Sequence, residues 1–133
     1  MADTLLLQLV SPERVLVDEQ VTEAQIPALN GFIGVLPGHA PLVSELMAGG
    51  VLSYHAGDGK EKVLAVYGGF VEVLPDRVRV LADAAEHKEE IDLAAAKDQL
   101  TKATAAAQQV QDDPDAAIAN VTRAQAKVDA ATK

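Results

Sequence analysis

Short apolar runs separated by Gly, Pro and Asp residues make up the first two thirds of the chain. The runs cover residues 5–10, 15–17, 21–26, 31–36, 51–55, 62–67, 69–74 and 77–82. In the last run, Val78 and Val80 share one face of an extended strand. The opposite face carries Arg77, Arg79 and Leu81. Because so many short strands cannot form one flat sheet with a dry face, the pattern predicts a β-sandwich of two packed, mainly antiparallel sheets.

After residue 86 the apolar positions recur at spacings of three and four. The first series is Leu93, Ala96, Leu100, Ala103, Ala107 and Val110, and the second is Ala117, Val121, Ala124, Val128 and Ala131. These spacings are typical of amphipathic helices. Asp92 is suited to cap the first helix, and Asp113 followed by Pro114 is suited to start the second. We predict helices over about 92–111 and 114–131, joined as an antiparallel α-helical hairpin by the short connection.

A change of composition near residue 86 divides the chain into two expected domains, 1–86 and 87–133. All 9 glycines lie at or before Gly69, whereas residues 87–133 contain 14 alanines and no glycine. Alanine is the best helix former, but its small side chain contributes little when it is buried. The hairpin is therefore expected to be stable as a pair of helices and weakly docked, which is the profile of a regulatory arm that can swing.

Charge and cysteine content exclude several function classes. The formal net charge is −9, and there is no basic stripe that could neutralise phosphates, so nucleic-acid binding is not expected. The absence of cysteine excludes a disulfide framework, a thiolate zinc site and a cysteine nucleophile. No 18-residue apolar run and no secretory signal are visible, so direct membrane insertion is not expected.

Candidate catalytic residues are few. The three histidines, His39, His55 and His87, lack the close spacing to each other and to carboxylates that a metal site requires. No glycine-rich phosphate loop precedes a helix. One alternative stays open, a sandwich enzyme in which His39 and Glu45 meet on neighbouring strands. The leading expectation is an interaction protein rather than an enzyme, with no catalytic residue, metal or cofactor of its own.

The most specific stretch covers residues 31–43, Gly-Phe-Ile-Gly-Val-Leu-Pro-Gly-His-Ala-Pro-Leu-Val. Together with Val-Ser-Pro-Glu at 10–13, Gly-Gly-Phe-Val-Glu-Val at 68–73 and the segment 78–86, it resembles the epsilon subunit of F-type ATP synthases over residues 3–133. The resemblance implies a non-catalytic rotor subunit of the central stalk, packed against the gamma subunit and the c-subunit ring. Such a subunit couples proton-driven rotation to ATP synthesis. It lies at the cytoplasmic face of the bacterial inner membrane as a peripheral part of the complex.

The resemblance also implies which residues meet those partners. The turn at 31–39 is similar to the family segment near the c-ring, which makes Phe32, Gly38 and His39 the candidate c-ring and gamma interface. Many members carry an acidic residue where this chain has Phe32, so an apolar contact would replace a polar one. Phe32 and Ile33 point to opposite faces of a strand, and only one of them need lie in the core.

In some bacterial members the hairpin inhibits ATP hydrolysis by extending along gamma toward the alpha/beta catalytic head. Certain members also bind regulatory ATP at the folded hairpin. The motif of those members is similar here at Ile91 and Asp92, but Ala95 stands at its arginine position. An alternative reading is that Asp92 is simply an N-cap.

Two basic residues of the second helix, Arg123 and Lys127, complete the candidate ATP site because they lie one helical turn apart and could face a phosphate. The alternative is that both are solvated. A rival for the whole chain is a stand-alone ATP-sensing module whose hairpin closes on the nucleotide.

Overall fold

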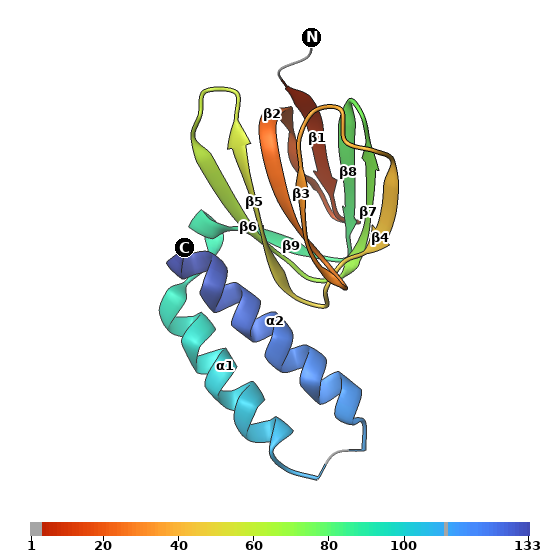
Figure 1. Cartoon of the computed structure of the whole chain (residues 1–133). Helices are drawn as coiled ribbons and strands as arrows, with labels where there is room; N and C mark the ends of the chain where they lie inside the picture. The colour runs from red at the N-terminus through yellow and green to blue at the C-terminus, as the bar shows by residue number, and fades with distance from the viewer. Residues whose placement is uncertain (1–3, 111) are drawn as a thin grey trace.

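The computed structural model describes residues 4–110 and 112–133, which form nine strands followed by a helical hairpin (Figure 1). The strands are β1 (Leu5–Val10), β2 (Val15–Ala28), β3 (Gly31–Val35), β4 (Leu42–Glu45), β5 (Gly50–Ala56), β6 (Glu61–Val66), β7 (Gly69–Leu74), β8 (Arg77–Ala82) and β9 (Ala85–His87). A single 3₁₀ turn, η1 (Lys88–Glu90), leads into helices α1 (Leu93–Ala107) and α2 (Pro114–Thr132). The β-sandwich followed by a helical hairpin is therefore confirmed.

The two layers of the sandwich are joined by β2. The strands follow one hydrogen-bonded order, β4-β7-β8-β1-β2-β5-β6-β9, and β3 also pairs with β2. The runs predicted separately at 15–17 and 21–26 are one strand of 14 residues. A register shift between Val21 and Glu23 in the pairing with β5 allows this, because such an irregularity bends a strand without ending it. All strand pairs are antiparallel except β1 with β8, which is parallel.

The sandwich has its own closed hydrophobic core. Its largest fully buried side chains include Leu5, Leu7, Leu9, Ile26, Leu52, Leu64, Val71, Val73 and Val78. The predicted facing of β8 is confirmed, because Val78 and Val80 are fully buried whereas Leu81 is 48% exposed. The buried residues of this core all lie between Leu5 and Ala85, so the core contains no residue of the hairpin.

Local capping sets the helix starts. The Asp92 side chain accepts a hydrogen bond from the Ala95 N–H at 3.2 Å, and Asp113 accepts one from Ala116 at 3.1 Å, which confirms both predicted N-caps. The first helix was predicted too long. It ends at Ala107, and Val110 is fully exposed in the loop. The chain has to reverse before Pro114 to bring α2 back beside α1, and residues 108–110 belong to that reversal. The predicted helix end, residue 111, lies outside the described residues.

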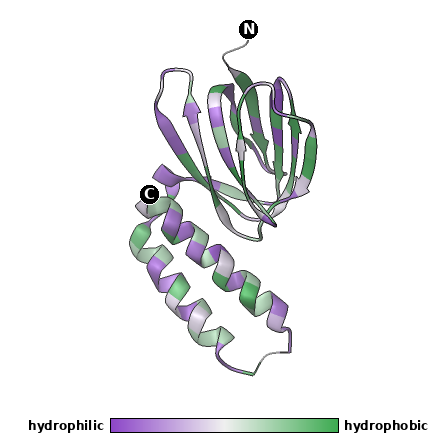
Figure 2. Ribbon diagram, in the orientation of Figure 1, coloured by the Kyte–Doolittle hydropathy of each residue, from purple (hydrophilic) through white to green (hydrophobic). Residues whose placement is uncertain are grey.

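The hairpin packs on the outside of the sandwich rather than within it. A second, smaller cluster joins Ala130 of α2 to Val63 and Ala65 of β6, with Ile91 and Val51 at its margin. Figures 1 and 2 show α2 lying between α1 and the sandwich, with mixed polar and apolar residues along both helices. Within the described residues, no helix is long and apolar enough to cross a membrane.

Candidate functional site

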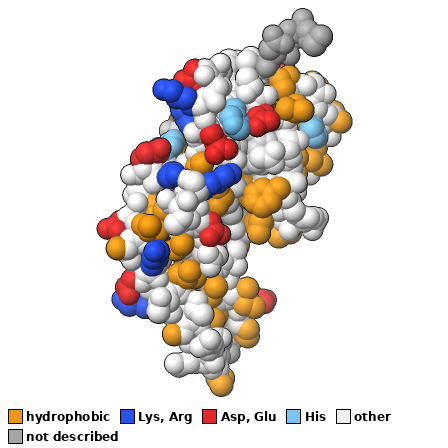
Figure 3. All heavy atoms as spheres, turned by 60° about the vertical axis from the view of Figure 1, so that its left-hand side comes forward, with side chains coloured by type: hydrophobic (Ala, Val, Ile, Leu, Met, Phe, Trp, Pro, Cys, Tyr) orange, Lys and Arg blue, Asp and Glu red, His pale blue; other side chains and the backbone are white. Residues whose placement is uncertain are grey.

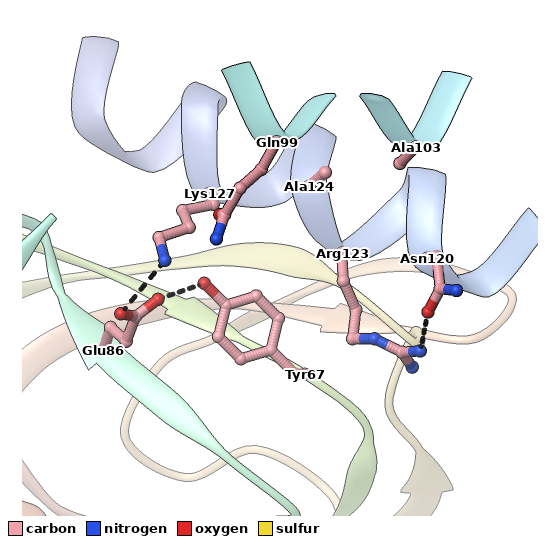
Figure 4. A pocket seen from close by; sticks show the side chains of 8 residues that line it. All are labelled: Tyr67, Glu86, Gln99, Ala103, Asn120, Arg123, Ala124 and Lys127. Carbon is pink, nitrogen blue, oxygen red and sulfur yellow. Dashed lines mark hydrogen bonds and ion pairs between the residues drawn. The ribbon is translucent and has the colours of Figure 1, made fainter. Parts of the chain in front are cut away.

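A cleft of about 440 Å³ lies where the hairpin meets the sandwich (Figure 4). Three elements contribute to it: the sandwich, α1 and α2. Its lining residues are Tyr67, Glu86, Gln99, Ala103, Asn120, Arg123, Ala124 and Lys127. The alanine side chains on the helix side are short and leave open space. The longer polar side chains around them project into this space. We call this space the hairpin cleft.

At one end of the hairpin cleft, three polar side chains are linked by a hydrogen bond and an ion pair. The Tyr67 hydroxyl donates a hydrogen bond to Glu86 Oε2 at 2.5 Å. Lys127 Nζ lies 3.5 Å from Glu86 Oε1, and both side chains are largely shielded from solvent. Burial, followed by the hydrogen bond to Glu86, raises the pKa of the Tyr67 phenol far above its ordinary value. The phenol therefore stays protonated and acts as a donor, and Glu86 connects β9 to α2.

The other end of the hairpin cleft is occupied by Arg123. Its guanidinium donates from Nη2 to Asn120 Oδ1 at 2.6 Å, one turn earlier on α2. Figure 4 shows Arg123 and Lys127 reaching down from α2 toward the sandwich on either side of Tyr67. Two cations and one carboxylate give the lining an excess of one positive charge. Such a site is chemically suited to an anionic group such as phosphate.

The other two residues of the predicted ATP site do not line the hairpin cleft. Ile91 is partly buried in the small cluster with Val63 and Ala130, and Asp92 caps α1. The structure thus brings together Arg123 and Lys127 but not Ile91 and Asp92. Glu86 and Tyr67 were missed by the sequence reasoning. No spacing rule connects them to α2, because only the folding of the hairpin onto β6 and β9 places them there.

The root of the hairpin is fixed to the sandwich by a bidentate ion pair. Arg14, in the β1–β2 turn, donates to the two carboxylate oxygens of Glu90 at 2.9 and 2.8 Å. Glu90 also accepts from the His87 N–H at 2.9 Å. The Arg14 hydrogen bond, reinforced by that of His87, lowers the pKa of Glu90 to about 2. The hairpin therefore leaves the sandwich from a defined point.

The predicted interface residues lie in two different places. Phe32 is 62% exposed at the start of β3, while its neighbour Ile33 packs against the core. Gly38 and His39 lie in the turn after the other end of β3. Gly38 has φ +86°, a conformation that favours glycine, and its N–H donates to the Pro75 carbonyl at 2.8 Å. The structure brings Gly38 and His39 together but separates both from Phe32.

The open alternative of a His39–Glu45 metal or catalytic site finds no support in the geometry. Glu45 is the last residue of the extended strand β4 (Leu42–Glu45), whereas His39 precedes the first residue of that same strand, so the two do not face each other from neighbouring strands. The His39 ring nitrogen Nδ1 lies 2.7 Å from the Ala40 carbonyl oxygen instead. Across the described ranges 4–110 and 112–133, no three His, Asp or Glu side chains form a group that could hold a metal ion.

An exposed apolar stripe crosses the outer face of the layer that contains β7, β8 and β1. Strand register aligns Phe70 with Leu81, Leu81 with Val10, and Val10 with Val15. Phe70 is 53% exposed, Leu81 48% and Val15 64%. On the same face, the Gln8 side-chain oxygen Oε1 is buried with no hydrogen-bond partner among the described residues. We call these four apolar residues the outer stripe.

Basic and acidic side chains are mixed on the surface beside the hairpin. On the face shown in Figure 3, Lys and Arg side chains are interspersed with Asp and Glu. No continuous basic stripe forms on that face.

Comparison with known proteins agrees with this architecture. Residues 4–88 match the family model described as ATP synthase, Delta/Epsilon chain, beta-sandwich domain. A protein named ATP synthase epsilon chain from Solibacter usitatus is 50% identical over 135 aligned residues, covering 100% of this chain and 99% of that protein. Another of the same name from Koribacter versatilis is 49% identical over 98 residues, covering 74% of this chain and 68% of that protein.

Solved structures share the fold. A chain in a cryo-EM structure of the Euglena gracilis mitochondrial ATP synthase aligns with a TM-score of 0.87 at 24% identity, covering 100% of this chain and 84% of that one. A chain in the central stalk and c-ring structure of the Tetrahymena thermophila mitochondrial ATP synthase aligns with a TM-score of 0.64 at 14% identity, covering 96% of this chain and 93% of that one. The family match over the sandwich and the 50% identity to an epsilon chain over the full length lead to one assignment. The chain belongs to the epsilon-chain family of the ATP synthases.

Proposed function

We propose that this chain is a non-catalytic rotor subunit of the central stalk of an F-type ATP synthase. In this role it couples proton-driven rotation to ATP synthesis, and its hairpin restrains ATP hydrolysis by extending to the alpha/beta head. The complex would hold it at the cytoplasmic face of the bacterial inner membrane. The observation that carries the proposal is the separation of two hydrophobic clusters. The sandwich keeps its core when the hairpin leaves, because no hairpin residue belongs to that core.

The outer stripe is the proposed contact for the gamma subunit. Phe70 and Leu81 are adjacent across two paired strands, so they present one continuous apolar surface to a partner. A stalk subunit needs such a permanent contact to turn with the rotor.

The turn that contains Gly38 and His39 is the proposed contact for the c-ring. It lies at the end of β3 away from the hairpin, so it remains accessible whether the hairpin is docked or extended. Phe32 lies at the other end of β3 and belongs to the hairpin side. Its ring is 62% exposed with the hairpin docked, and it lines a pocket together with residues of α2.

A pull-down of the full chain with the gamma subunit of its own complex tests the proposal. The double variant Phe70→Ser, Leu81→Ser should bind gamma at least about tenfold more weakly, because two apolar side chains leave the contact. The matched control is Val110→Ser, which also removes an exposed apolar side chain but lies in the hairpin loop. If the unaltered chain fails to bind gamma, the rotor assignment is wrong. If the control weakens binding as much as the double variant, the outer stripe is not the contact.

A second candidate function is regulatory ATP binding in the hairpin cleft, acting on the same arm. It is supported by the convergence of Arg123 and Lys127 on one cavity beside the neutral Tyr67 donor. A triphosphate held there would join α2 to the sandwich and keep the hairpin closed. If the chain acted outside the complex, the same site would make it a stand-alone ATP-sensing module.

Isothermal titration of the purified full chain with ATP tests this second function. Binding should be measurable and should weaken on the order of tenfold in Lys127→Ala, because a charge-assisted phosphate contact is lost. The control is Lys102→Ala, which removes a charge that pairs with Asp98 on exposed α1, outside the cleft. The absence of heat with ATP would rule this function out and would leave the rotor role untouched.

A further inference from the structure

The docked position of α2 depends on a glycine that directly precedes β5. Gly49 is buried immediately before β5. A Cβ built on it would lie 2.7 Å from Arg123 Cα, 2.7 Å from the Thr122 carbonyl oxygen and 2.9 Å from the Arg123 amide nitrogen. All three atoms belong to the backbone of one turn of α2. The sandwich and the helix therefore meet here backbone to backbone, without any side chain between them.

The next residue, Gly50, is also tightly packed, but against the sandwich and not against α2. A Cβ on Gly50 would lie 2.5 Å from Pro27 Cβ, within the sandwich itself. Gly50 thus permits close packing of β5 on β2, whereas Gly49 permits close packing of α2 on the sandwich. Neither glycine adopts a positive φ, so the requirement for glycine here is one of space and not of backbone conformation.

We infer that Gly49 is a positioning residue that seats α2 on the sandwich and thereby sets the place of Arg123 in the hairpin cleft. Carbon atoms in contact prefer separations of about 3.5 Å or more, so a methyl group at Gly49 pushes α2 outward by at least about 0.8 Å at Arg123. The neighbouring turn cannot absorb this by rotating a side chain, because the clashing atoms are backbone. The displacement therefore passes to the helix as a rigid body.

The apolar contact of α2 with the sandwich is sensitive to such a displacement. Ala130 packs on Val63 and Ala65, and this contact depends on the same close approach, since an alanine side chain extends only one carbon beyond the helix backbone. Lifting α2 at Arg123 consequently opens this contact as well. Two polar contacts join α2 to the sandwich through longer side chains: Lys127 Nζ lies 3.5 Å from Glu86, and Lys133 Nζ donates to Ser53 Oγ at 3.2 Å. Gly49 acts through the helix and touches no ligand itself.

The experiment uses the full chain without nucleotide, so its outcome does not depend on the proposed ATP site or on the rotor assignment. The chain contains no cysteine, so Glu61→Cys and Asp115→Cys provide two unique labelling positions, one on the sandwich and one on α2. Spin-label distances between them report docking directly. Gly49→Ala should broaden and lengthen the distance distribution. In parallel, amide hydrogen exchange in α2 should accelerate on the order of tenfold while exchange in β1 and β8 stays unchanged.

The matched control is Gly57→Ala in the β5–β6 turn, where a Cβ would meet only the Gln20 carbonyl oxygen at 3.9 Å. It should leave both measurements as in the parent chain. An unchanged distance in Gly49→Ala overturns the inference. Loss of protection throughout β1 and β8 in that variant, or failure of the chain to fold, also overturns it, because Gly49 would then serve the sandwich and not the seating of α2.

Discussion

Replacing Ala130 by glutamate is expected to release the hairpin while the sandwich stays folded. Ala130 has no exposed surface and packs on Val63 and Ala65 of β6. Glutamate is a good helix former, so α2 itself should persist. In the docked state, however, the new carboxylate lies against an apolar strand, where burial of a charge without a partner is unfavourable. In the released state the carboxylate is hydrated.

The size of the effect follows from this difference in environment. The two basic groups three residues away along the chain are already engaged, Lys127 by Glu86 and Lys133 by the Ser53 hydroxyl. Leaving a buried charge unpaired costs about 3 kcal/mol or more, which corresponds to a shift on the order of a hundredfold from docked to released hairpin. The core of the sandwich should be unaffected, because its buried members all lie between Leu5 and Ala85.

Limited trypsin digestion combined with thermal melting measures the two effects separately. In Ala130→Glu, cleavage after Arg123 and Lys127 should become much faster, while the melting temperature of the β-structure stays within a few degrees of the parent. The control is Ala116→Glu, which adds the same charge at an exposed position of α2. A melting transition that falls together with the faster cleavage would show that hairpin and sandwich form one cooperative unit, and it would refute the reasoning.

Three further predictions concern the separate stabilities of the sandwich and the hairpin. Deleting residues 88–133 should leave a chain that folds by circular dichroism and still binds gamma, and it should raise ATP hydrolysis by the reconstituted complex; an unchanged rate would mean that the arm does not inhibit. Since the pKa of Glu90 is lowered to about 2, its pair with Arg14 contributes stability above the unfolded value of about 4.5, and this contribution is lost as pH falls through 2. Glu90→Gln should remove the acid dependence of amide hydrogen exchange in the hairpin. If the variant and the parent chain show the same pH profile, the Arg14–Glu90 pair does not stabilise the docked hairpin. Leu64→Ala, at a fully buried core position, should destabilise the sandwich by about 2–5 kcal/mol in urea titration, and a loss below 1 kcal/mol would argue against a tightly packed core.

Features governed by local chemistry could be predicted from the sequence. The alternation in β8 located its buried face, and the carboxylates of Asp92 and Asp113 located both helix starts. These signals depend on a few neighbouring residues, so no knowledge of the tertiary fold is needed. The end of α1 lacked such a signal. No glycine follows Ala107, and the apolar spacing continues to Val110 although the chain is already reversing there.

Features created by packing between distant segments could not be predicted from spacing. The hairpin cleft combines Tyr67 and Glu86 with α2, and only the docked hairpin brings them together. One signal for docking was nevertheless present. The run Val63, Leu64, Ala65, Val66 does not alternate, because β6 is covered by the core on one face and by α2 on the other. A continuous apolar strand in an otherwise alternating sandwich indicates that a further element covers it.

The parallel pairing of β1 with β8 has a consequence for how the chain is made. Leu6 pairs with Arg77 and Val10 with Leu81, so the first strand cannot complete its layer until some 80 residues have left the ribosome. The hairpin emerges from the ribosome after that moment. It therefore meets a finished surface on β6 and docks last. Each newly made chain thus passes through a stage in which all nine strands have emerged and the arm has not.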